Sequence, residues 1–75
     1  MVNVLLFGRL AEICGQSNFV FDLPDTDAVC EKLKNDFPEM KPLSFAIAVN
    51  QVLIVHNTRL KDEDEVALMP PYSGG

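Results

Sequence analysis

Apolar and polar residues alternate at the start of the chain, as they do in a half-buried β-strand. Residues 2–7 ("VNVLLF") are β-branched, aliphatic or aromatic apart from Asn3, and Gly8 ends the run. Because successive side chains of a strand point to opposite faces, Asn3 marks the outer face. The residues predicted to point inward are Val2, Val4 and Leu6, and those predicted to point outward with Asn3 are Leu5 and Phe7.

A second strand is predicted at residues 19–23 ("FVFDL"), where Phe19, Phe21 and Leu23 share one face. Between the two strands, residues 9–14 ("RLAEIC") predict one short helical turn that Gly15 closes. The two strands should therefore form a hairpin with an enlarged loop.

One long helix is predicted in "DTDAVCEKLKNDFP", with Thr26 or a flanking aspartate as its N-cap. Apolar residues recur every fourth position along it, at Val29, Leu33 and Phe37. Pro38 cannot continue the helix and should end it. The helix therefore presents one apolar stripe for packing.

The rest of the chain predicts three more strands. Two short apolar runs in "FAIAVNQVLI" flank Asn50-Gln51, which predicts a tight hairpin. Four consecutive acidic residues, 62–65, indicate a solvated turn, and "VALMP" is the last strand. The order β, β, α, β, β, β predicts an α+β domain, a mixed sheet of about five strands with one main helix packed on one face.

Composition limits the size and the partners of this domain. Seventy-five residues, 48% of them apolar, are enough for one small domain with a single core. Six basic residues are scattered among eleven acidic ones, which gives a net charge of -5 and opposes nucleic-acid binding. No signal peptide or long apolar segment is recognised, so we expect a cytoplasmic protein with no membrane contact.

The side chains do not form a recognisable catalytic set. There is no Ser/His/Asp combination, phosphate loop or metal-ligand cluster, and His56 is the only histidine. Cys14 and Cys30 are sixteen positions apart, which fits neither a redox pair nor a zinc site, so both are expected to be reduced. We expect no enzyme activity from the chain alone and no permanently bound cofactor or metal. His56 should lie at the surface, at a strand end.

The tail holds the most unusual chemistry. Pro70-Pro71 favours an extended spacer, and the five residues after Pro70 could reach about 16 Å. Glycine has no Cβ, so Gly74 and Gly75 could pass through a narrow channel and deliver the α-carboxylate of Gly75. Joined to AMP, that carboxylate becomes an activated acyl group, which sulfide would convert to a thiocarboxylate. We therefore predict a folded body at 1–70 and a flexible tail at 71–75, mobile from Tyr72.

Taken together, "VLLFGRLAEICG", "FAIAVNQVLI" and "DEDEVALMPPYSGG" resemble the small subunits of molybdopterin synthase, within the ubiquitin-like sulfur-carrier family. The resemblance covers the whole chain and is most specific at the Pro-Pro and Gly-Gly of its end. It implies a ubiquitin-like β-grasp fold. One departure is Ala11, where some members have a basic residue, so partner contacts of that loop are not carried over.

The resemblance also implies a reaction for the tail. An E1-like enzyme would use ATP to adenylate Gly75, and a sulfur-donor protein would supply the sulfur. Gly74, which has no side chain, would let the tail pass through the partner's narrow channel. The tail would then enter the large catalytic subunit, in a heterotetramer of two small and two large subunits. There its sulfur would convert precursor Z, the cyclic pyranopterin monophosphate, to molybdopterin.

The predicted strand faces suggest where partners bind. In a β-grasp sheet the first and last strands are neighbours, so Leu5, Phe7, Ala67 and Met69 should form one apolar patch. Such a patch is either covered by a loop or used for docking. Along the tail, the residues predicted to contact partners are Pro70, Pro71, Tyr72 and Ser73.

Other functions fit the same ending. A sulfur carrier for thiamine thiazole synthesis also ends in Gly-Gly, although that family normally lacks the Pro-Pro. A ubiquitin-like modifier would link Gly75 to lysines through isopeptide bonds, and a plain binding module would have an inert end.

Overall fold

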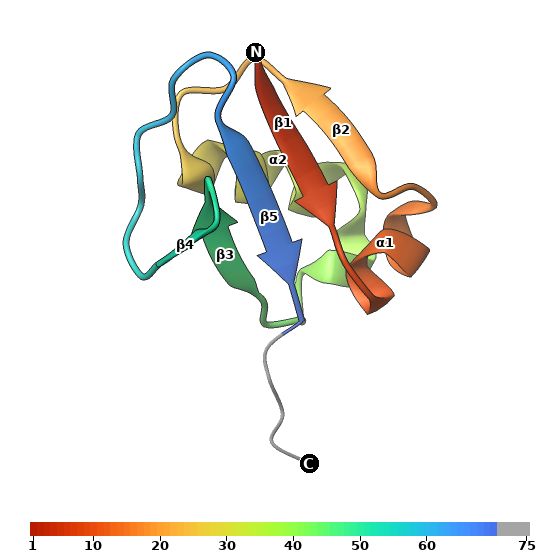
Figure 1. Ribbon diagram of the computed structural model, residues 1–75. Coiled ribbons are helices and arrows are strands. Elements are labelled where there is room, and N and C mark those ends of the chain that lie inside the picture. The colour runs from red at the N-terminus through yellow and green to blue at the C-terminus, as the bar shows by residue number, and fades with distance from the viewer. Residues whose placement is uncertain (71–75) are drawn as a thin grey trace.

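A five-stranded mixed sheet forms the front layer of the molecule (Figure 1). The computed structural model describes residues 1–70 of the 75. The strands, in chain order, are β1 (Val2–Leu6), β2 (Asn18–Phe21), β3 (Ala46–Val49), β4 (Val52–Ile54) and β5 (Glu65–Met69), and their order across the sheet is β2-β1-β5-β3-β4. β1 and β5 are parallel neighbours, while the other pairs are antiparallel. The predicted pairing of the first and last strands is therefore confirmed.

The helices lie where the sequence pattern predicts them. α1 (Arg9–Cys14) lies in the connection between β1 and β2, and it ends at Gly15, whose φ of 74° is left-handed. α2 (Thr26–Asp36) crosses the back of the sheet, and a 3-10 turn, η1 (Pro38–Met40), follows it (Figure 1). The N-cap of α2 is Asp25, whose side chain accepts a hydrogen bond of 2.9 Å from the Ala28 amide. Within residues 1–70, no helix is long and apolar enough to span a membrane.

The core lies between the sheet and α2. The strand residues predicted to point inward are buried, and the apolar stripe of α2 packs against them. The most deeply buried of these side chains are Val4, Val29, Leu33, Val66 and Leu68. The predicted α+β architecture, with one long helix on one sheet face, is confirmed.

Asn50 and Gln51 form the tight turn between β3 and β4. Their φ angles are 50° and 72°, as a two-residue hairpin turn of this kind requires at both positions. Asn tolerates the left-handed region, and its side chain is also held from outside the turn. Its amide donates to Asp64 Oδ1 at 3.0 Å and its carbonyl oxygen accepts from the Glu65 amide at 3.0 Å. The loop before β5 thus fixes the hairpin.

Three predicted boundaries differ from the structure. β1 ends at Leu6 rather than Phe7, although the Phe7 amide still donates to the Leu68 carbonyl at 3.1 Å. β2 is Asn18–Phe21 rather than residues 19–23, because Phe21 already pairs with Val2, the first residue of β1. The last strand, β5, runs from Glu65 to Met69 rather than from Val66 to Pro70, so the acidic run is only partly a solvated turn. The predicted flexible tail, 71–75, lies outside the described residues.

Candidate partner-binding groove

A row of directly paired residues crosses the outer face of the sheet, opposite α2. Leu5 of β1 pairs with Ala67 of β5, Ala67 pairs with Ala48 of β3, and Ala48 pairs with Leu53 of β4. Directly opposed residues point to the same face of a sheet, so all four side chains lie on this face.

Small side chains in the middle of this row and large ones around it create a groove. Ala48 and Ala67 form its floor, because a methyl group rises little above the backbone. The groove has a volume of about 590 Å³. The residues that line it are Leu5, Phe7, Ala48, Gln51, Leu53, Glu65, Ala67 and Met69.

The rim of the groove exposes large apolar side chains. Phe7 is 47% exposed and Leu53 is 67% exposed, so no loop within residues 1–70 covers them. Contiguous exposed apolar residues commonly mark binding surfaces. The structure thus brings all four residues of the predicted patch, Leu5, Phe7, Ala67 and Met69, into one groove. That partners bind there stays a prediction.

The sequence interpretation missed one half of the groove. Ala48, Gln51 and Leu53 come from the hairpin of β3 and β4. Alternation within "AIAV" and "VLI" places Ala48 and Leu53 on one common face of the hairpin. Which face of the sheet that is depends on the pairing of β3 with β5, which the local pattern does not contain.

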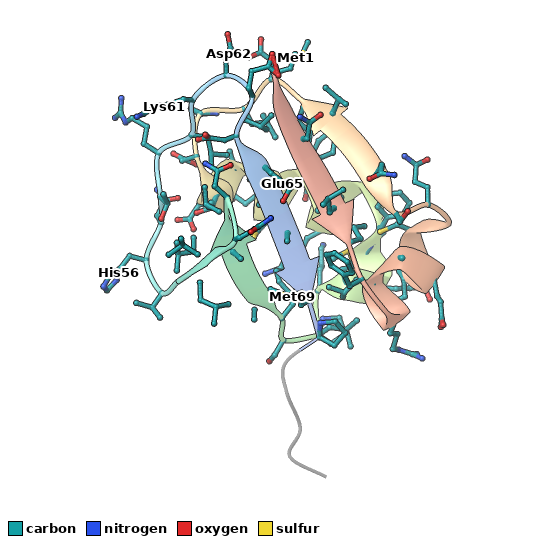
Figure 2. The ribbon with its side chains drawn as sticks, viewed as in Figure 1. Met1, His56, Lys61, Asp62, Glu65 and Met69 are labelled. Atoms are coloured by element: carbon teal, nitrogen blue, oxygen red, sulfur yellow. The ribbon has the colours of Figure 1, made fainter. Side chains whose placement is uncertain are left out.

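The tail starts at one end of the groove. Met69 is both the last residue of β5 and part of the groove lining, and Pro70 follows it directly (Figure 2). Pro70 packs closely on Gly8, where an added Cβ would lie 3.1 Å from Pro70 Cγ. The other tail residues predicted to function, Pro71, Tyr72, Ser73, Gly74 and Gly75, lie outside the described residues.

Negative charge gathers at the opposite end of the groove. Glu65 lines that end, and Figure 2 shows it at the far end of β5 from Met69. Next to it, Asp64 accepts hydrogen bonds from the Lys61 amide at 2.8 Å and from the Asn50 side chain at 3.0 Å. The Lys61 bond, followed by the Asn50 bond, holds the pKa of Asp64 below its ordinary value.

The N-terminus is also tied to this acidic loop. The Met1 ammonium group forms an ion pair with Asp62, and the Glu63 amide donates to the Met1 carbonyl at 2.8 Å (Figure 2). The hydrogen bond to Asp62 raises the pKa of the Met1 amine above its ordinary value. The loop that borders the groove is therefore held from two sides, by Met1 and by Asn50.

The cysteines and the histidine are not part of the groove lining. Residues 1–70 contain no group of three or more His, Cys, Asp or Glu side chains placed to hold a metal ion. Cys14 is buried with its Sγ 3.4 Å from Met40 Sδ, and burial raises the pKa of the Cys14 and Cys30 thiols, which disfavours their thiolates. His56 is exposed just after β4, as predicted.

Known proteins resemble this chain over nearly its whole length. The model of the ThiS family matches residues 4–75. The molybdopterin synthase sulfur carrier subunit of Dictyostelium discoideum is 32% identical, over 97% of this chain and 94% of its own length.

Two solved structures share the fold. Small archaeal modifier protein 1 from Methanosarcina acetivorans is 29% identical, with a TM-score of 0.86 over 99% of this chain and 95% of its own. The complex of subunits 1 and 2 of the molybdopterin-converting factor from Helicobacter pylori contains a chain that is 32% identical, with a TM-score of 0.73 over 99% of this chain and 97% of its own. These likenesses confirm the predicted β-grasp fold.

Proposed function

Since this chain belongs to the ThiS family, we propose that it is the sulfur carrier subunit of a molybdopterin synthase, in the biosynthesis of the molybdenum cofactor. In this role the chain is not a catalyst by itself. It presents its own C-terminus as the reacting group, and its partners supply the catalytic side chains.

The proposed chemistry takes place at Gly75. An E1-like partner joins a carboxylate oxygen of Gly75 to the α-phosphorus of ATP, and pyrophosphate leaves. Sulfide supplied by a donor protein then attacks the activated carbonyl carbon, AMP leaves with one of the former carboxylate oxygens, and a thiocarboxylate remains. The large subunit transfers the sulfurs of two such thiocarboxylates to precursor Z to form the dithiolene of molybdopterin, and each transfer returns Gly75 to a carboxylate. ATP is thus used by the adenylating partner, and the carrier itself needs no bound cofactor.

The observation that best supports this proposal is the position of the groove next to the start of the tail. A protein seated in the groove contacts Met69, the last residue of the last strand. The five residues after Pro70 can reach about 16 Å at roughly 3.3 Å per residue. The groove can therefore hold a partner so that the partner's active site lies within reach of the tail.

Two successive partners would use this surface, the adenylating enzyme and the large catalytic subunit. The solved complex of subunits 1 and 2 from Helicobacter pylori supports the large subunit as a partner, because its similar chain is bound to the second subunit. We propose that the assembly is a heterotetramer of two small and two large subunits. Glu65 and the acidic loop before it would form a rim that attracts basic residues of either partner.

A second function is supported by a separate likeness. Small archaeal modifier protein 1 matches this chain with a TM-score of 0.86 at 29% identity. A modifier would use the same adenylated Gly75, but its acyl group would be transferred to a lysine amine rather than to sulfur. The two functions share the first step and differ only in the nucleophile.

Mass spectrometry of the protein purified from its native cells separates these functions. A sulfur carrier should show a C-terminal peptide in which one sulfur replaces one oxygen, whereas a modifier should show Gly75 linked to lysines of other proteins. The matched control is the Gly75→Ala variant expressed at the same level, which should lose either product. An unmodified Gly75 under conditions of active molybdopterin synthesis would contradict both functions.

A further inference from the structure

The parallel pair of β1 and β5 ends at a contact between Gly8 and Pro70. Leu6 pairs with Leu68, and the Phe7 amide donates to the Leu68 carbonyl at 3.1 Å. Two residues further along the same register, Gly8 lies beside Pro70, and a Cβ added at Gly8 would lie 3.1 Å from Pro70 Cγ and 3.6 Å from Pro70 Cδ. Pro70 has no N–H with which to extend the ladder. The contact of its ring with Gly8 therefore takes over where the hydrogen bonds of this strand pair stop.

Position 8 has little room for a side chain. Carbon atoms in ordinary contact are about 3.5–4.0 Å apart, so a Cβ 3.1 Å from Pro70 Cγ would press on the ring. Gly8 also has a φ of 57° and a ψ of -132°, a conformation that L-residues rarely adopt. Its carbonyl accepts from the Ala11 amide at 3.1 Å and from the Glu12 amide at 3.3 Å, which holds this conformation at the start of α1. Because Pro70 is exposed, a side chain at position 8 displaces its ring more easily than it displaces the turn.

Pro70 is the residue through which the tail joins the sheet. A proline ring fixes its own φ at about -65° and restricts the preceding residue, here Met69, to extended conformations. The position of the ring therefore sets the point at which the tail starts. We propose that Gly8 is a positioning residue: without a side chain, it lets the Pro70 ring pack against the end of β1 and so directs the carboxylate of Gly75 to the partner's active site. Gly8 has this role only if the proposed function holds.

The position of Pro70 should affect the reaction at Gly75 rather than the binding of the partner. In the proposed function the partner is held in the groove, and Met69 lines the end of the groove nearest the tail. Gly8 and Pro70 are not among the residues that line the groove, so a shift of the Pro70 ring leaves the lining residues themselves unchanged. A misplacement of about 1 Å can cost roughly a hundredfold in rate. We therefore expect a slower reaction with unchanged affinity.

Steady-state adenylation of the full chain by its E1-like partner separates these two effects. In Gly8→Val, kcat should fall at least about tenfold while the KM for the carrier stays within about twofold. Gly15→Val is the matched control, because Gly15 also has a positive φ, 74°, but nothing lies within 4 Å of an added Cβ. Both variants should lose stability, and circular dichroism at the assay temperature measures the folded fraction. Only Gly8→Val should lose kcat per folded chain.

Pro70→Ala removes the other partner of the contact without straining the backbone. It should also lower kcat about tenfold, and the double variant Gly8→Val/Pro70→Ala should be no slower than its slower parent, because both changes remove one contact. A loss of about a hundredfold in the double variant would mean that the two residues act independently, and it would overturn the proposal. So would equal kcat values for Gly8→Val and Gly15→Val, or a KM that rises while kcat is unchanged.

NMR of the isolated chain tests the contact without any partner. A nuclear Overhauser effect between the Gly8 Hα atoms and the Pro70 ring protons is expected in the wild type and should be lost in Gly8→Val. Its absence from the wild type would overturn this role of Gly8 and leave the sulfur-carrier function standing. A wild-type chain that its E1-like partner never adenylates would instead overturn the proposed function, and this role with it.

Discussion

At the scale of single residues, two glycines have opposite roles. Gly75→Ala should leave thermal melting unchanged, because the tail lies beyond the last strand, and should strongly reduce sulfur transfer, because a methyl group crowds the reacting carbonyl. Gly15→Ala is the matched control: its φ of 74° costs an alanine roughly 1–2 kcal/mol of stability, with nothing within 4 Å to collide with. It should lower the melting temperature and leave transfer by the folded fraction intact. If Gly75→Ala lowers the melting temperature as well as the rate of sulfur transfer, the terminus has a structural role.

Single side chains in the groove should also control partner binding. Phe7→Lys or Met69→Lys should weaken binding to the large subunit by more than about 1 kcal/mol, because a charge would be buried at the centre of the contact. Titration calorimetry measures this effect. Val55→Lys, at a residue 89% exposed and outside the groove, should change little. If both groove variants bind the large subunit with unchanged affinity, this surface is not where the large subunit binds.

At the scale of elements, α2 depends on its N-cap. The Asp25 carboxylate satisfies the Ala28 amide, so Asp25→Ala should reduce the free energy of unfolding by about 0.5–2 kcal/mol. Asp25→Asn keeps an acceptor oxygen in the same place and should lose much less. Urea unfolding of the two variants provides the comparison, with Asp22→Ala as an exposed control. A loss in Asp25→Asn as large as in Asp25→Ala would argue against the capping hydrogen bond.

The link between the β3–β4 hairpin and the acidic loop should depend on pH. The pKa of Asp64 is lowered from 3.8 by the Lys61 amide and then by the Asn50 side chain. Its stabilising contribution is therefore present above about pH 3.8 and is lost as the pH falls through the lowered pKa. Asn50→Gly keeps the positive φ but removes one donor, so the Asp64 pKa measured by NMR should rise toward 3.8. In the control variant, Gln51→Gly, the Asp64 pKa should stay low.

At the scale of the whole molecule, one core joins the helix to the sheet. Leu33 is fully buried between them, so Leu33→Ala should cost about 2–5 kcal/mol. A chain of this length has a total stability of roughly 4–11 kcal/mol, and the variant should lose a large part of it. Thermal unfolding should remain one transition by circular dichroism and by NMR. Val52→Ala, at a residue 65% exposed, should cost little, and a helix that melts before the sheet would contradict a shared core.

The local sequence pattern was sufficient for most elements. The alternation around Asn3 correctly placed Val4 and Leu6 in the core, and Gly15 correctly ended α1. These features depend on neighbours in the chain: side-chain direction alternates along a strand, and a left-handed φ favours glycine. The end of β2 was wrong, because it depends on where its partner strand begins.

The residues of the groove also fall into two groups, those that the local pattern predicted and those that it did not. Strand alternation by itself determined that Leu5 of β1 and Phe7, just after β1, share one face and that Ala67 and Met69 share one face of β5. Only the tertiary structure decided that Ala48 and Leu53 complete the groove, because that requires β3 to pair with β5 in a register that sets Ala48 beside Ala67. Such pairing joins residues far apart in the chain, and the packing of the whole core selects it, so no local pattern of apolar and polar residues encodes it.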